Sequence, residues 1–110
     1  MAIKSWILQR ITAVLIIPVI IYFVSYFMNI NTFSYDDIKN DITSVPGILI
    51  IFISSFTIYL HSALGLEVII EDYIHHAELQ RILVHISNIF HLILLLFTVS
   101  MLFIISGTAA

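Results

Sequence analysis

The chain has 110 residues, of which 61% are hydrophobic and only 10% are charged, and its mean hydropathy is +1.12. A soluble domain carries about 25% charged residues, and one this short cannot bury so much apolar surface, which excludes a soluble globular enzyme. Four Lys and Arg against seven Asp and Glu give a net charge of −3, which argues against nucleic acid as a partner. The absence of cysteine excludes disulfides, cysteine-ligated zinc and iron–sulfur clusters within the chain.

Three long apolar stretches indicate how the chain is organised. The hydrocarbon core of a bilayer is about 30 Å thick, so a helix needs roughly 20 apolar residues to cross it. The stretches predict transmembrane helices over residues 7–28, 47–70 and 82–105. We expect residues 29–46, which are rich in Asp, to form a solvated connector, and the short segment 71–81 to join the last two helices as an antiparallel hairpin. The predicted fold is an all-α integral membrane protein with three transmembrane helices in an up-down-up arrangement, a single domain over residues 1–110.

The orientation of these helices follows from the positions of lysine and arginine, which favour the inner side of a membrane. Three of the four, Lys4, Arg10 and Arg81, fall on one side of the predicted arrangement, and only Lys39 falls on the other. We therefore expect the N-terminus inside and the C-terminus outside.

The second predicted helix carries a polar and small-residue face in an otherwise apolar segment. At about 100° per residue, Ser54, His61, Gly65 and Asp72 lie on one stripe. Because a helix rises about 1.5 Å per residue, His61 lies about 16 Å deeper than Asp72, near the middle of the bilayer. An ionisable side chain at that depth indicates function. Two hypotheses remain open: a hydrogen bond between helices, or an axial haem ligand with Gly65 leaving room for the macrocycle.

Asp72 and Tyr73 stand at the end of this helix, in the interfacial zone. Tyr73 fits an aromatic belt, or a phenol that donates a hydrogen bond to a quinone carbonyl while Asp72 handles protons. Arg10, expected on the same side as Tyr73, is either a snorkelling cation or a partner for an anion such as a haem propionate, with Lys4 as a weaker helper.

His91 on the third helix lies at about the same predicted depth as His61, since each is about ten residues from the inner end of its helix. The pair is compatible with a bis-histidine site within the chain, and equally with hydrogen bonds between adjacent helices.

Two segments resemble a known family. The pattern His61-x-x-x-Gly65 followed by Asp72-Tyr73-Ile74-His75 resembles the signature of the smaller hydrophobic anchor subunit of succinate dehydrogenase (respiratory complex II). The segment 6–13, Trp-Ile-Leu-Gln-Arg-Ile-Thr-Ala, resembles the start of that family's first helix. The Asp-Tyr-Ile-His ending is similar to that of alphaproteobacterial and mitochondrial members, which implies ubiquinone as the acceptor.

The resemblance implies a four-subunit assembly in the bacterial cytoplasmic or mitochondrial inner membrane. A flavoprotein subunit oxidises succinate, an iron–sulfur subunit carries the electrons, and two anchor subunits, one of the cytochrome b type, bind haem b and reduce quinone. It further implies His61 as one axial haem ligand, with the second from the partner anchor. Tyr73 assisted by Asp72 becomes the quinone site, and Arg10 a propionate contact.

Two other functions stay open from the residues alone. The first is a non-catalytic structural or assembly protein of the membrane. The second is a small stand-alone b-type cytochrome that uses both His61 and His91.

Overall fold

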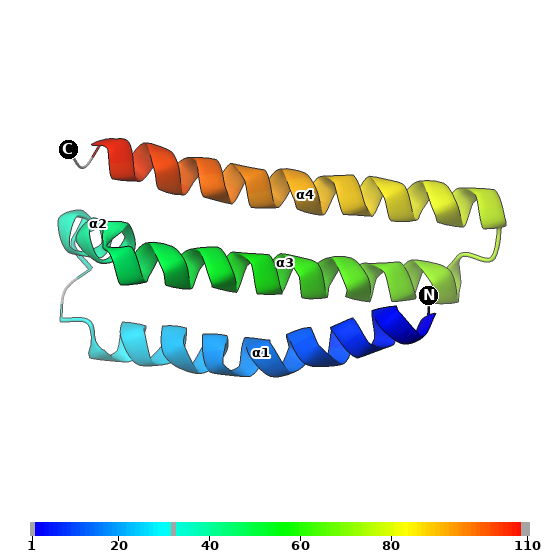
Figure 1. Cartoon of the computed structure of the whole chain (residues 1–110), viewed down its shortest axis with the longest axis horizontal. Helices are drawn as coiled ribbons and strands as arrows, with labels where there is room; N and C mark the ends of the chain where they lie inside the picture. Colours follow the sequence, from blue (N-terminus) through cyan, green and yellow to red (C-terminus); the bar gives the residue numbers. More distant parts are fainter. Residues whose placement is uncertain (1, 32, 109–110) are drawn as a thin grey trace.

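The computed structural model describes residues 2–31 and 33–108. That part of the chain forms four helices, which are α1 (Ala2–Asn29), α2 (Tyr35–Thr43), α3 (Val45–Tyr73) and α4 (Ala77–Thr108). The three long helices lie side by side along an axis of 51 Å, with α3 between α1 and α4 (Figure 1). Within the described residues α3 contacts both neighbours, whereas α1 and α4 do not contact each other.

All three long helices are long and apolar enough to cross a membrane, over Lys4–Asn29, Val45–Tyr73 and Ala77–Gly107. Successive long helices run in opposite directions, so the N-terminal end of α1 lies beside the α3–α4 connection and the C-terminal end of α4 lies beside α2 (Figure 1). The expected all-helical fold with three spans is therefore confirmed. The side of the membrane on which each end lies stays a prediction.

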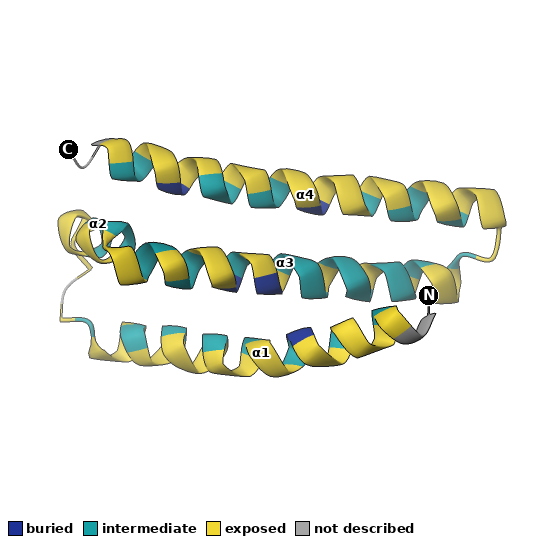
Figure 2. Cartoon of the chain, viewed as in Figure 1, coloured by how far each residue is buried: buried dark blue, intermediate teal, exposed yellow. Residues whose placement is uncertain are grey.

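The burial pattern is the reverse of that in a soluble domain. Among the described side chains the buried ones are mostly polar, namely Thr12, Ser54, Thr57 and His91, with Leu102 as the apolar exception. The large aliphatic and aromatic side chains instead cover the outer faces of the helices, most of which are exposed (Figure 2). Lipid tails are as apolar as a protein core, so burying apolar side chains between helices gains little in a membrane. Helix contacts there rely on small residues and hydrogen bonds.

Helix α2 was not expected, because residues 29–46 were predicted only as a solvated connector. Ser34 begins the helix by accepting a hydrogen bond from the amide of Asp37 at 3.1 Å. Ile38 and Ile42, four residues apart, give it a half-buried apolar face among polar residues, and it packs against α3 and α4. The density of charge in this segment concealed its helical period.

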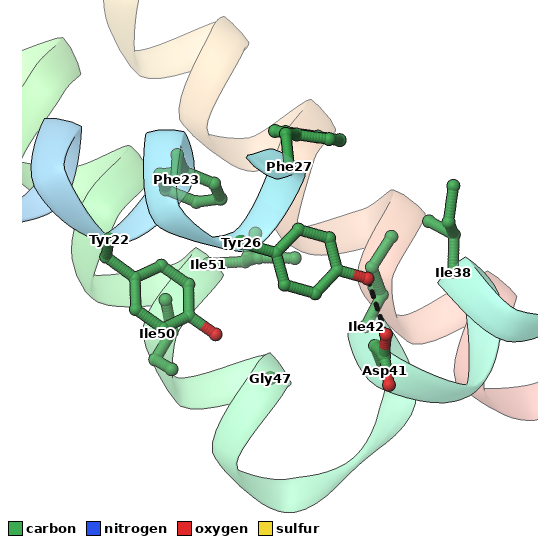
Figure 3. A pocket seen from close by; sticks show the side chains of 10 residues that line it. All are labelled: Tyr22, Phe23, Tyr26, Phe27, Ile38, Asp41, Ile42, Gly47, Ile50 and Ile51. Carbon is green, nitrogen blue, oxygen red and sulfur yellow. Dashed lines mark hydrogen bonds between the residues drawn. The ribbon is translucent and has the colours of Figure 1, made fainter. Parts of the chain in front are cut away.

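The junction of α2 and α3 is tight. An apolar pocket lies between this junction and α1. Ser44 accepts from the Gly47 amide at 3.1 Å and donates to the Asp41 carbonyl at 2.7 Å, which starts α3 directly after α2. Tyr26 of α1 donates to the Asp41 carboxylate across this junction (Figure 3). The remaining walls of the pocket are aromatic and aliphatic side chains, namely Tyr22, Phe23, Phe27, Ile38, Ile42, Ile50 and Ile51.

Candidate functional site

His61 lies in the middle of α3 and faces α1. It is about 24 Å from Val45 and about 18 Å from Tyr73 along the helix axis. Its Nδ1 atom lies 2.9 Å from Oγ1 of Thr12, a buried α1 side chain that is 4% exposed. One turn away, Gln9 of α1 donates from Nε2 to the Leu64 carbonyl at 3.1 Å. Two adjacent polar contacts therefore join α1 to α3 at the depth of the imidazole.

The Thr12 hydroxyl also has acceptors on its own helix. Its Oγ1 lies 2.8 Å from the Leu8 carbonyl and 3.1 Å from the Gln9 carbonyl. A hydroxyl has one proton and can accept from other donors. If Thr12 donates to Leu8, the Nδ1–H of His61 donates to Thr12, and Nε2 keeps its lone pair. No hydrogen bond to Nε2 of His61 is present among the described residues.

His91 is occupied on both ring nitrogens. Its Nδ1 donates to the Ser87 carbonyl at 2.7 Å, because a carbonyl only accepts. In the neutral ring Nε2 then accepts from the Ser62 hydroxyl, which lies 2.9 Å away on α3. The side chain is 7% exposed. The contact with Ser62 joins α4 to α3, as does the hydroxyl pair Tyr59–Thr98 at 2.9 Å.

The two imidazoles share a depth but not a site. The predicted match in depth holds, since His91 contacts Ser62, the residue next to His61. However, His61 hydrogen-bonds α1 while His91 hydrogen-bonds α3 and its own helix. Across the described residues no cluster of three or more potential metal-ligating side chains occurs. The two imidazoles are therefore engaged by different neighbours.

Gly65 leaves open space on the His61 stripe. A Cβ atom built there would meet nothing within 4 Å. A side-chain carbon at this position would therefore touch no other helix among the residues that the structure describes. A free imidazole nitrogen beside a glycine with open surroundings fits a flat macrocycle held by His61, so the donor set and the space agree with haem.

Arg10 lies deeper than the sequence suggested. Because Thr12 pairs with His61 and Gln9 pairs with Leu64, Arg10 is within about 3 Å of the level of His61 along the axis. It is exposed, and its guanidinium lies 5.2 Å from the centre of the Trp6 ring. Arg10 thus lies between the level of His61 and that of Tyr73, and it is closer to His61. Lys4 is exposed about two turns nearer the end of the bundle.

Tyr73 and Asp72 are at the C-terminal end of α3, beside the α3–α4 connection. Tyr73 is 79% exposed, and Asp72 is also exposed. Neither side chain makes a hydrogen bond or ion pair within the described part of the chain. The pocket of Figure 3 lies at the opposite end of the bundle, beside α2, and so does not coincide with the predicted quinone residues.

Sequence reasoning missed the residues that surround the imidazoles. Thr12 and Gln9 were part of the segment that carried the family resemblance, but they were given no role. Ser62 was given no role either. A signal was present: Gln9 and Thr12 are polar residues three positions apart in an apolar helix, which places them on one face.

Comparison with known proteins agrees with the fold. Residues 2–101 match the family described as succinate dehydrogenase/fumarate reductase transmembrane subunit. The succinate dehydrogenase hydrophobic membrane anchor subunit of Rickettsia prowazekii (strain Madrid E) is 36% identical over 92 residues, which cover 77% of this chain and 68% of the relative. That of Rickettsia typhi (strain ATCC VR-144 / Wilmington) is 35% identical over 92 residues, with the same coverage.

The match extends over nearly the whole chain, and the relatives carry the same description as the family suggested by residues 6–13 and 61–75. That resemblance is confirmed. Together with three candidate spans, it places the chain in an inner membrane that it crosses several times. The chain belongs to the succinate dehydrogenase/fumarate reductase transmembrane subunit family.

Proposed function

We propose that this chain is the membrane anchor of a succinate:quinone oxidoreductase, in which it helps to bind haem b and ubiquinone. Electrons reach quinone from a partner iron–sulfur subunit, which receives them from a flavoprotein subunit. The chain lacks cysteine, so it holds no cysteine-ligated cluster of its own and depends on another polypeptide for electrons. It has no catalytic activity alone.

The observation that carries this proposal is the state of His61. The imidazole lies at mid-span, one nitrogen contacts Thr12, and the other has no partner within the described residues. A neutral imidazole binds iron through such a free nitrogen. When bound, haem would supply a one-electron reservoir.

A second polypeptide completes the haem site. Both nitrogens of His91 are engaged, so the second axial ligand comes from the partner anchor subunit. Within the described residues a Cβ at Gly65 would meet nothing within 4 Å, and we assign this space to the macrocycle, with the partner covering it. Arg10, near the level of His61, is within reach of a propionate and neutralises its charge.

Quinone reduction is assigned to the end of the bundle that carries Tyr73. Its exposed phenol has no partner among the described residues and is free to donate to a quinone carbonyl. Asp72 next to it accepts and releases protons. The N-terminal end of α1 and the α3–α4 connection lie at this same end (Figure 1), and the count of Lys4, Arg10 and Arg81 against Lys39 supports an inner location for it.

The haem spectrum of the assembled complex tests this proposal. His61→Phe removes the ligand and keeps a planar side chain, and we expect the sharp reduced bands of a six-coordinate b-type haem to be lost. His85→Phe is the matched control, because His85 is exposed and makes no hydrogen bond in the described residues. An unchanged spectrum in His61→Phe would instead support the rival role, in which His61 only joins α3 to α1.

A further inference from the structure

We infer that Thr12 is a positioning residue for the axial imidazole: it receives the Nδ1 proton of His61 and thereby fixes which nitrogen faces iron. This inference rests on the proposed function, because it presumes that His61 is a haem ligand. It concerns a residue on a different helix, which touches no part of the cofactor.

The protons available to His61 and Thr12 determine the direction of the hydrogen bond between them. If Nε2 binds iron, the proton of the neutral ring is on Nδ1, and Nδ1 needs an acceptor. The Thr12 oxygen is the atom at 2.9 Å. Its own proton then goes to the Leu8 carbonyl at 2.8 Å. When Nδ1–H donates to Oγ1 and Oγ1–H donates to the carbonyl, every donor has an acceptor. If Thr12 instead donates to Nδ1, the proton of the neutral ring is on Nε2, and Nε2 cannot bind the metal.

The surroundings of Thr12 make this contact a fixed one. The side chain is buried at 4% exposure, and its hydroxyl is anchored by the carbonyls of Leu8 and Gln9. One turn along the interface, Gln9 donates to the Leu64 carbonyl, which holds α1 in register with α3. The imidazole therefore meets its acceptor in a defined rotamer, set by the packing of two helices rather than by one side chain.

A hydrogen bond from Nδ1–H makes an imidazole more basic and orients its plane. A more basic ligand stabilises ferric iron more than ferrous iron, so the contact lowers the haem midpoint potential. Loss of such an outer contact typically weakens cofactor binding by about 10-fold to 100-fold. Each tenfold change in the ratio of ferric to ferrous affinity shifts the potential by about 59 mV.

The experiment uses the complete haem-containing complex. Thr12→Val replaces the hydroxyl with a methyl group, Thr12→Ala removes both the hydroxyl and the γ-methyl group, and Thr12→Ser keeps the hydroxyl. Thr57→Val is the matched control: Thr57 is 6% exposed, and its hydroxyl donates only to the Ile53 carbonyl of its own helix at 2.8 Å. The readouts are the haem midpoint potential, the electron paramagnetic resonance g values and the haem content per complex.

We expect Val and Ala at position 12 to raise the potential and lower haem retention about 10-fold or more, while Thr12→Ser and Thr57→Val match the unmodified complex. Unchanged potential and g values in Thr12→Val and Thr12→Ala would overturn the role of Thr12. The proposed function would still stand in that case if His61→Phe loses haem. Equal effects in Thr57→Val, or no rescue by serine, also overturn the role of Thr12, because packing alone then explains the change. Haem retained in His61→Phe contradicts the proposed function itself.

Discussion

The contact between His91 and Ser62 offers a test of how α4 is held against α3. His91→Leu replaces the imidazole with an apolar side chain of similar length that has no nitrogen. Ser62→Ala removes the partner hydroxyl. Interhelical hydrogen bonds in membranes contribute about 0.6 kcal/mol on average and up to about 1.7 kcal/mol. Since the 2.9 Å contact has its acceptor ring buried at 7% exposure, the coupling energy is expected within that range.

The coupling is measured by a double-mutant cycle, in which the unfolding free energies of both single variants are compared with that of the double variant. Unfolding by sodium dodecyl sulfate in detergent micelles, followed by circular dichroism, provides these energies. A coupling of about 0.6 to 1.7 kcal/mol changes the ratio of folded to unfolded chain by roughly 3-fold to 18-fold. Ser62→Ala combined with Ser100→Ala is the control, because Ser100 is exposed on α4 and forms no hydrogen bond with Ser62.

A coupling below about 0.3 kcal/mol, which is the error of additivity, would refute the assignment of this contact as a stabilising one. The haem spectrum gives a second check in the assembled complex. His91→Leu is expected to retain six-coordinate haem, because both nitrogens of His91 are already engaged within the chain. Loss of haem equal to that in a His61 variant would show that His91 is the second ligand, as in a stand-alone cytochrome.

Three further outcomes are expected. Gly65→Leu should block haem incorporation while α3 remains folded, since a Cβ at this position would meet none of the described residues within 4 Å; normal haem content would remove Gly65 from the site. Gly47→Ala should lower stability by about 1–3 kcal/mol in thermal unfolding, because its Cβ would lie 1.9 Å from the Asp41 carbonyl oxygen; an unchanged midpoint would contradict this close approach. Tyr73→Phe should reduce quinone reduction at least 10-fold while succinate oxidation with a soluble acceptor survives, and Tyr35→Phe, an exposed tyrosine at the opposite end, should change neither; equal quinone rates in both variants would exclude the phenol.

The spans and the depth of His61 were predictable because both depend only on the number of residues along a helix. Apolar length fixes which segments cross a bilayer, and the helical rise fixes how deep each residue lies. The shared depth of His61 and His91 was obtained in this way and agrees with the contact between His91 and Ser62.

The neighbours of each imidazole were not predictable in the same way. A helical period identifies a face but not the helix that packs against it, so His61 and His91 appeared as a possible pair. Hydroxyl residues carry little signal, because each can donate to its own helix. Thr12 and Thr57 both do so, and only the packing of α1 against α3 gives Thr12 a second contact.

Helix α2 was missed for a different reason. Charge was used to assign residues 29–46 to solvent, and the pair Ile38 and Ile42 was not weighed as a helical period. The same charges are compatible with a surface helix, since Asp36 and Asp37 stand in its first turn, where negative charge is favourable.

The axial bond itself can be observed in a high-resolution electron cryo-microscopy map of the assembled complex. We expect planar density beside Gly65, with continuous density from its centre to Nε2 of His61 and to a side chain of another polypeptide on the opposite face. The Nδ1 atom of His61 should remain within hydrogen-bond distance of Thr12. Density that joins the iron to His91, or a macrocycle bound away from α3, would contradict the assignment of His61 as the haem ligand.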